Sequence, residues 1–246
     1  MTATVLFIHG FLDDATVWDG VIAVLASAVD VIQYDLPGSG TRSPAVADLD
    51  TVTLESLAAE AGDIVAGIDA PVIVVGHSMG SQVAELVAAS HADRVQGLVL
   101  VTPVPLGGTQ LPAEELAPFR ALGGDTDAQR TLRSQVSPNL AADQLDRLVH
   151  IGGAVRPDVA ARYADMWNEG VSNAPTTSAF TGPVLIIRGG ADAFVTEQLL
   201  AATTSRFVQP NVKVIDKGGH WLHVEYPEAL ATTILGFTEP ITRVTA

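Results

Sequence analysis

Short apolar runs rich in Val and Ile alternate along the chain with longer stretches of helical periodicity. The runs are Val5–Ile8, Val29–Tyr34, Val72–Val75, Leu98–Val101, Val184–Ile187 and Val212–Ile215. Most of them lack polar alternation, which is typical of strands that are covered on both faces. Strands that alternate with helices in this way predict an α/β fold, with a mostly parallel sheet of about six strands and flanking helices.

The flanking helices are expected in the amphipathic stretches between the runs, at Thr16–Ser27, Leu54–Ile68, Gly80–Ala89, Thr196–Thr204 and Pro227–Leu235. One interval differs, because no strand-like run appears from Pro103 to about Gly182. It contains further helical stretches at Ala113–Leu122, Gln129–Val136, Ala141–Ile151 and Pro157–Trp167. An insertion of this length is too long for an ordinary loop.

We therefore expect residues 104–182 to form a helical cap that is inserted after the fourth strand. Residues 1–103 and 183–246 would form the core of the same continuous domain. The cap would lie over the carboxyl edge of the sheet, which is where open parallel sheets bind ligands. A chain of 246 residues, 48% of them hydrophobic, has enough apolar side chains for one such domain.

The formal net charge of −15 argues against a nucleic-acid partner, because a phosphate backbone is held by clustered Lys and Arg. Lys213 and Lys217 are the only lysines, and the arginines are scattered singly. We interpret the acidity as a solubility feature, with a preference for neutral or cationic substrates as the alternative.

The chain has no cysteine, which excludes a disulfide framework, a thiolate metal site and a cysteine nucleophile. Its first residues carry no basic region, and the apolar run Val5–Ile8 is too short for a signal sequence. No stretch approaches the roughly 20 apolar residues of a membrane span. We therefore expect a soluble, cytoplasmic protein without a membrane partner; the oligomeric state does not follow from the sequence.

A candidate nucleophile follows the third apolar run, in Gly76-His77-Ser78-Met79-Gly80. A Gly-x-Ser-x-Gly string is weak by itself, but here a buried strand precedes it and a helix follows it. This context is typical of a sharp strand-to-helix turn that raises a serine above the sheet edge. The two glycines would remove side chains that collide across the turn. An ordinary βα turn with a structural serine is the alternative.

A serine hydroxyl needs a base, and His220 follows the last apolar run directly after Gly218-Gly219. A loop at the carboxyl end of that strand would bring the imidazole over the sheet towards Ser78. His223 is the local rival, for which packing at a helix start or solvent exposure is the structural alternative.

The carboxylate that holds the imidazole in its working tautomer is expected at Asp192, just beyond the run Val184–Ile187. Ser78, Asp192 and His220 then follow the order Ser, Asp, His along the chain. Asp216 is the alternative, although its closeness in sequence to His220 makes the side-chain approach awkward.

An oxyanion hole is expected from the backbone N–H groups of Phe11 and Met79. Phe11 lies in the turn after the first strand, and Met79 follows the nucleophile. The Phe11 side chain is also a candidate for the acyl pocket, with core packing as the alternative.

These blocks together resemble the α/β-hydrolase superfamily over essentially the whole chain. The matching residues are His9–Phe11, Asp35–Gly40, Gly76–Gly80, Gly189–Asp192 and Gly218–His220. Within this superfamily the chain resembles small bacterial serine carboxylesterases that are similar to pimeloyl-ester esterases and cofactor-free haloperoxidases. Two departures stand out: the chain starts at what resembles the family's third strand, and Ser81 replaces a frequent glycine.

The resemblance implies hydrolysis of a carboxylic ester through an acyl-enzyme, without a metal or an organic cofactor. A lactonase, a carbon–carbon bond hydrolase and a perhydrolase or haloperoxidase would use the same three residues. A ligand-binding receptor with a vestigial hydrolase site is the alternative from another class.

Apolar residues of the cap and of the catalytic loops are the candidate substrate pocket: Phe11, Leu106, Phe119, Met166, Trp167, Phe194 and Trp221, with Leu222 beside them. They predict a medium-sized, largely apolar ester or lactone as the small-molecule substrate. Core packing is the alternative for each of these side chains.

Overall fold

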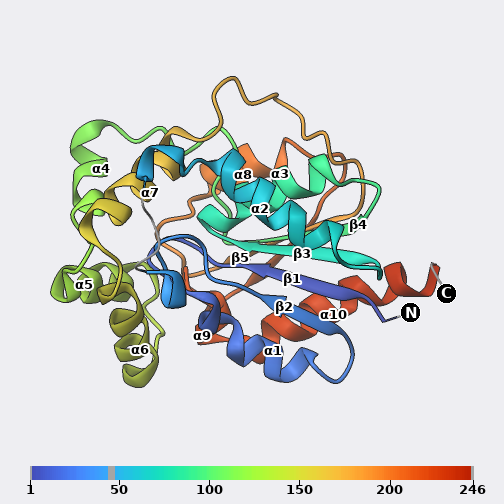
Figure 1. Ribbon diagram of the computed structural model, residues 1–246. Coiled ribbons are helices and arrows are strands. Elements are labelled where there is room, and N and C mark those ends of the chain that lie inside the picture. Colours follow the sequence, from blue (N-terminus) through green and yellow to red (C-terminus); the bar gives the residue numbers. More distant parts are fainter. Residues whose placement is uncertain (1, 44–47, 245–246) are drawn as a thin grey trace.

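A six-stranded sheet forms the centre of the computed structural model, which describes residues 2–43 and 48–244 (Figure 1). The strands are β1 (Thr4–Ile8), β2 (Asp30–Gln33), β3 (Val72–His77), β4 (Val95–Val101), β5 (Val184–Gly189) and β6 (Asn211–Ile215). Their order across the sheet is β2-β1-β3-β4-β5-β6, and every neighbouring pair is parallel. The predicted α/β class with a six-stranded parallel sheet is confirmed.

Alternate residues of the central strands enter two separate hydrophobic clusters, one on each face of the sheet. Leu6, Val74 and Leu98 face the cluster that contains α2 and α3 side chains. Phe7, Val75 and Val99 face the cluster formed with α1 and α10. The central strands are therefore apolar at successive positions, as expected for strands covered on both sides. The edge strand β6 differs, with Val212 and Val214 exposed.

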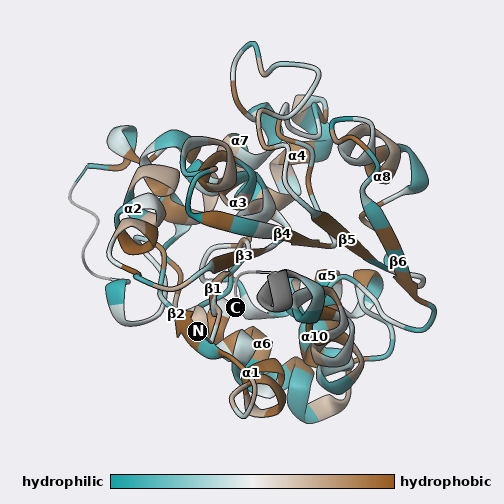
Figure 2. Cartoon of the chain, turned by 90° about the vertical axis from the view of Figure 1, so that its right-hand side faces the viewer, coloured by the Kyte–Doolittle hydropathy of each residue, from teal (hydrophilic) through white to brown (hydrophobic). Residues whose placement is uncertain are grey.

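The helices of the core lie on both faces of the sheet, as the view along it shows (Figure 2). One face carries α2 (Leu54–Ala66), α3 (Met79–Ser90) and α8 (Glu197–Thr204), and the other carries α1 (Asp19–Leu25) and α10 (Pro227–Val244). The short helix α9 (Leu222–Glu225) packs against α1 and α10 on this second face. Short 3-10 helices occur at Ala15–Trp18, Gly40–Arg42 and Leu49–Thr51. The helix expected at Thr16–Ser27 is divided into a 3-10 turn and α1, and the Asp14 side chain caps the start of the 3-10 turn by accepting a hydrogen bond from Thr16 N.

Four helices separate β4 from β5, where the sequence predicts an inserted helical cap after the fourth strand. They are α4 (Ala113–Arg120), α5 (Thr126–Val136), α6 (Ala142–Gly153) and α7 (Pro157–Glu169). Figure 1 shows them together at one end of the sheet, with α4 against α7 and α5 against α6. We refer to α4–α7 as the inserted helices. The insertion after the fourth strand is confirmed; the division at residues 104 and 182 stays a prediction.

Within the ranges described, no helix combines the length and the hydropathy that a membrane crossing requires.

Candidate active site

Ser78 lies in a strained turn between β3 and α3. Its φ of 51° and ψ of −121° fall in a region that residues other than glycine rarely adopt. A Cβ on Gly76 would lie 2.2 Å from the carbonyl oxygen of Gly80, and a Cβ on Gly80 would lie 2.5 Å from that of His9. Only glycine fits at either position, which is the physical reason for the Gly-x-Ser-x-Gly spacing.

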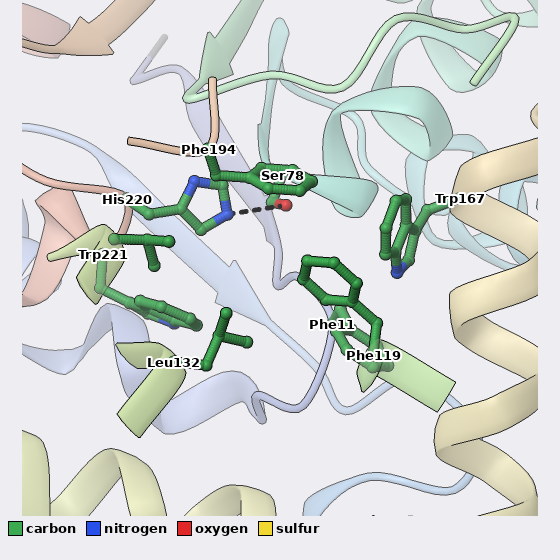
Figure 3. A pocket seen from close by; sticks show the side chains of 9 residues that line it. Phe11, Ser78, Phe119, Leu132, Trp167, Phe194, His220 and Trp221 are labelled. Atoms are coloured by element: carbon green, nitrogen blue, oxygen red, sulfur yellow. Dashed lines mark hydrogen bonds between the residues drawn. The ribbon is translucent and has the colours of Figure 1, made fainter. Parts of the chain in front are cut away.

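The three candidate catalytic side chains form a continuous chain of hydrogen bonds at the carboxyl edge of the sheet. The Nε2 atom of His220 lies 3.0 Å from Ser78 Oγ, and its Nδ1 atom lies 2.9 Å from Asp192 Oδ2. Figure 3 shows the imidazole pointing at the serine oxygen. All three residues are buried. Each follows a strand of the sheet, namely β3, β5 and β6, so the parallel topology brings together residues that are distant in sequence.

The second oxygen of Asp192 is held by the backbone. Asp192 Oδ1 accepts hydrogen bonds from the N–H groups of Phe194 and Val195, at 2.8 and 3.0 Å. Burial alone would raise the pKa of Asp192, but the charge and the hydrogen bond of His220 and these two N–H groups lower it below its ordinary value. An ionised Asp192 accepts the Nδ1 proton of His220, which leaves Nε2 free to accept the serine proton.

The sequence rivals of these residues lie elsewhere. Asp216 is exposed, and the acid hydrogen-bonded to His220 is Asp192. His223 is fully buried in α9, with its ring 4.5 Å from that of Trp18 and 4.3 Å from that of His77. Packing at a helix start therefore describes His223, and solvent exposure does not.

The turn after β1 packs tightly against the start of α3. A Cβ on Gly80 would lie 2.6 Å from the carbonyl oxygen of Ile8. The backbones of the two segments are therefore in direct contact, with no side chain between them. This contact brings the segments of Phe11 and Met79 to one place beside Ser78. The N-terminus of α3 also directs unpaired N–H groups and the positive end of the helix dipole towards this place. The oxyanion-hole role of the two N–H groups stays a prediction.

A mostly apolar cavity opens onto Ser78 and His220. Its other lining residues are Phe11, Phe119, Leu132, Val136, Trp167, Phe194 and Trp221. The rings of Phe119, Trp167 and Phe194 stand edge to face, with centroids 5.3 to 5.7 Å apart. Figure 3 shows these aromatic side chains gathered around the serine oxygen. Side chains of α4, α5 and α7 thus complete a site whose reactive groups come from the core.

Phe11, Phe119, Trp167, Phe194 and Trp221 line the cavity as the sequence predicts, whereas Leu106, Met166 and Leu222 do not. Met166 and Leu222 point into the two core clusters instead. Leu106 is buried where its segment meets the end of α7, and its carbonyl oxygen accepts a hydrogen bond from Val171 N. Sequence reasoning missed Leu132 and Val136, and their position in the expected helix Gln129–Val136 was the available signal.

Asp13, His77 and His223 form a buried group whose potential metal-ligand atoms lie within 4.8 Å of one another. Both oxygens of Asp13 already accept a hydrogen bond from Trp221 Nε1, and Oδ1 also faces Arg133. A cation at this place would meet the charge of Arg133 and compete for occupied lone pairs. The donor set therefore fits an ion pair better than a metal.

The profile of the Alpha/beta hydrolase family matches residues 5–233. The chain belongs to this family. As a member, it has the fold described above, and the resemblance inferred from the five sequence blocks is confirmed.

Curated relatives of this α/β hydrolase carry several names. It is 42% identical over 104 residues to the dihydrolipoyllysine-residue acetyltransferase component of an acetoin cleaving system from Cupriavidus necator. The aligned segment makes up 42% of this chain and 27% of that protein. The chain is 25% identical over 186 residues to a mouse sn-1-specific diacylglycerol lipase, which is 68% of this chain and 59% of the lipase. The chain thus spans less than two thirds of the length of both.

Other matches cover nearly the whole α/β hydrolase. The pimeloyl-[acyl-carrier protein] methyl ester esterase of Neisseria meningitidis is 29% identical over 252 residues, which is 96% of this chain and 92% of the esterase. A hydrolase from Oleispira antarctica has a similar structure, with a TM-score of 0.82 and 20% identity over 96% of this chain and 91% of that one. The second comparison concerns the fold alone.

Proposed function

We propose that this protein is a serine hydrolase that cleaves a carboxylic ester of a medium-sized, largely apolar substrate. The observation that carries the proposal is the hydrogen-bonded sequence Ser78–His220–Asp192 at the floor of an apolar cavity. Water is the second substrate, and no cofactor is needed. The esterase relatives support an ester as the bond that is cleaved.

In the proposed reaction, Ser78 Oγ attacks the ester carbonyl carbon while His220 Nε2 takes the hydroxyl proton. The N–H groups of Phe11 and Met79 stabilise the oxyanion of the tetrahedral intermediate. The intermediate collapses, the C–O bond to the alcohol breaks, and His220 gives its proton to the leaving oxygen. Water then attacks the acyl-enzyme with His220 as base, which releases the acid and restores Ser78.

The lining of the cavity supports an uncharged substrate. Aromatic and aliphatic side chains surround Ser78 and His220. The buried charges near the cavity already have partners, since Asp192 is bonded to His220 and Asp13 to Arg133. A charged acyl or alcohol group in this cavity would lose its hydration without gaining a partner. We also propose that the inserted helices act as the cap of the site, since α4, α5 and α7 supply part of its wall.

A panel of p-nitrophenyl esters, lactones and diketones, assayed with the wild-type protein and with Ser78→Ala, tests the proposal. We expect ester hydrolysis by the wild type and a loss of at least about 10³-fold in kcat in the variant. If the wild type prefers lactones or diketones by a wide margin, the same catalytic groups would be assigned to cleavage of that bond instead of an ester. Ester hydrolysis by Ser78→Ala at the rate of the wild type would overturn the proposal.

A further inference from the structure

A buried ion pair joins one of the inserted helices to the turn that carries the candidate oxyanion hole. Arg133 of α5 and Asp13 are both inaccessible to solvent, and Arg133 Nη1 lies 3.2 Å from Asp13 Oδ1. Arg133 Nη2 also donates a 2.7 Å hydrogen bond to the carbonyl oxygen of Leu12. Leu12 and Asp13 directly follow Phe11, so this guanidinium fixes the backbone just beyond the proposed donor.

The same ion pair reaches the loop of the candidate general base. Trp221 Nε1 donates hydrogen bonds to both oxygens of Asp13, at 2.9 and 3.0 Å. The guanidinium carbon of Arg133 lies 4.3 Å from the centre of the Trp221 ring, in a cation–π contact. Because Trp221 follows His220, the three side chains form a closed unit between the oxyanion turn and the histidine loop.

The end of α5 also holds the backbone of His220. His220 N donates to the carbonyl oxygen of Val136, at 2.9 Å, and Trp221 N donates to Ser137 Oγ, at 2.8 Å. A Cβ on Gly219 would lie 2.4 Å from Ser137 Cα, so the glycine before the histidine permits this close approach. The backbone of the histidine is thus bonded to an inserted helix, while its side chain is bonded to the core.

From the core side, the carbonyl oxygen of His220 accepts hydrogen bonds from His77 Nε2 and Thr102 Oγ1, at 2.9 and 3.1 Å. The other nitrogen of His77 lies 3.5 Å from Asp13 Oδ2. Asp13 therefore contacts both side chains, Trp221 and His77, that flank the catalytic histidine.

Burying the charges of Arg133 and Asp13 is costly, because both groups lose their hydration. A hydrophobic pair of similar volume would fill the same space without this desolvation penalty. Burial alone would raise the pKa of Asp13, but the contact of His77 and the charge of Arg133 lower it below its ordinary value. The carboxylate is ionised and accepts hydrogen bonds from fixed directions, which apolar side chains would not provide.

We infer that Arg133 and Asp13 are positioning residues for the hydrolytic reaction, an inference that rests on the proposed function. Their ion pair holds the oxyanion turn and the His220 loop in register with each other. Because Arg133 belongs to α5, correct docking of this inserted helix becomes a condition for the catalytic geometry.

The variants Arg133→Met, Arg133→Lys and Asp13→Asn test the inference, with Arg130→Met as the matched control. Arg130 lies on the same helix, but its ion pair with Asp146 is exposed. For each variant, kcat and KM on a p-nitrophenyl ester are compared with the rate of Ser78 modification by a fluorophosphonate and with the thermal midpoint. Active-site titration with the same probe gives kcat per folded molecule.

We expect Arg133→Met to lower kcat and the modification rate by about 10- to 100-fold, because displacement of catalytic groups by about 1 Å can cost 10²-fold. KM should change little, since neither charge contacts the cavity. Arg133→Lys should recover part of the loss, because an ammonium group reaches Asp13 but cannot also stack on Trp221 and bond to Leu12. The Arg130→Met control should behave as the wild type. The double variant Asp13→Asn/Arg133→Met should lose no more than the worse single variant.

Unchanged kcat and modification rate in a folded variant with a lower thermal midpoint would reduce the pair to a structural role and overturn the inference. A rise in KM alone would also overturn it. If Arg133→Met fails to fold, the kcat values of Arg133→Lys and Asp13→Asn decide by the same criteria. A wild-type protein that does not react with the fluorophosphonate would overturn the proposed function first, and the inference with it.

Discussion

The proton on Nδ1 of His220 has one side-chain acceptor, Asp192, and the proposed reaction depends on this contact. Asp192 accepts that proton with one oxygen and is fixed through the other by the N–H groups of Phe194 and Val195. Its pKa lies below the ordinary value, because these contacts outweigh the effect of burial. The carboxylate thus orients the imidazole, and in the proposed reaction it would stabilise the imidazolium that forms when Ser78 loses its proton.

Asp192→Asn should keep the shape of this contact but change its donors and acceptors. An amide that donates to Nδ1 selects the tautomer with the proton on Nε2, which cannot accept the serine proton. We expect kcat on a p-nitrophenyl ester to fall by about 10⁴-fold at neutral pH. The exposed Asp216→Asn is the control and should retain full activity. Comparable activity of the two variants would contradict the role of Asp192.

The candidate catalytic residues could be predicted from the sequence because each follows a Val- and Ile-rich run. Parallel strands end at one edge of the sheet, so Ser78, Asp192 and His220 had to lie near one another. Asp13 and Arg133 could not be predicted in this way. Their contact joins residues that are 120 positions apart, and neither position carries a local motif.

At the scale of the elements, strands were easier to predict than the roles of helix faces. The run Val72–Val75 and the turn at Ser78 are local patterns, and the structure contains both. Met166 and Trp167 are neighbours on α7 and belong to the same core cluster, yet only Trp167 also lines the cavity. Both side chains are apolar, so the packing partner, and not the helical pattern, decides which one faces the substrate site.

Helix α4 places Phe119 at a boundary between cavities. This ring lines the cavity at Ser78 and also a groove between α4 and α5. In Phe119→Ala the two spaces should join, and a longer acyl chain should then bury additional methylene groups, at about 0.8 kcal/mol each. We expect the ratio of kcat/KM for a p-nitrophenyl decanoate to that for the butyrate to rise at least about tenfold.

Phe207→Leu provides the control for this change, since Phe207 is buried in the core away from the cavity. It should lower the thermal midpoint without altering the chain-length ratio. If Phe119→Ala left the ratio unchanged, the groove would have no part in acyl binding.

The molecule as a whole encloses several uncharged histidines. Burial lowers the pKa of His9, His77 and His223 below 6.5, and the effect is largest for His223. These groups bind protons more readily in the unfolded chain than in the folded one. The unfolded state therefore gains protons as the pH falls below about 6.5, and the folded state loses stability from that point downwards.

The free energy of unfolding, measured by urea titration between pH 8 and 5, should be nearly constant above about pH 7 and should fall below about pH 6.5. His223→Leu should reduce the slope of this fall, since it removes a buried group that excludes protons. The exposed His150→Gln is the control and should leave the slope unchanged. A slope that is the same in all three proteins would show that His223 does not contribute to the pH dependence of stability.

A covalent acyl group on Ser78 is the most direct test of the whole account. The protein is mixed with p-nitrophenyl acetate, quenched in acid within the first turnovers, digested and analysed by mass spectrometry. The account predicts that the peptide containing Ser78 gains the mass of one acetyl group in the wild type. In Ser78→Ala no peptide gains that mass, and hydrolysis is lost. An acetyl group on another residue, or wild-type hydrolysis by Ser78→Ala, would contradict it.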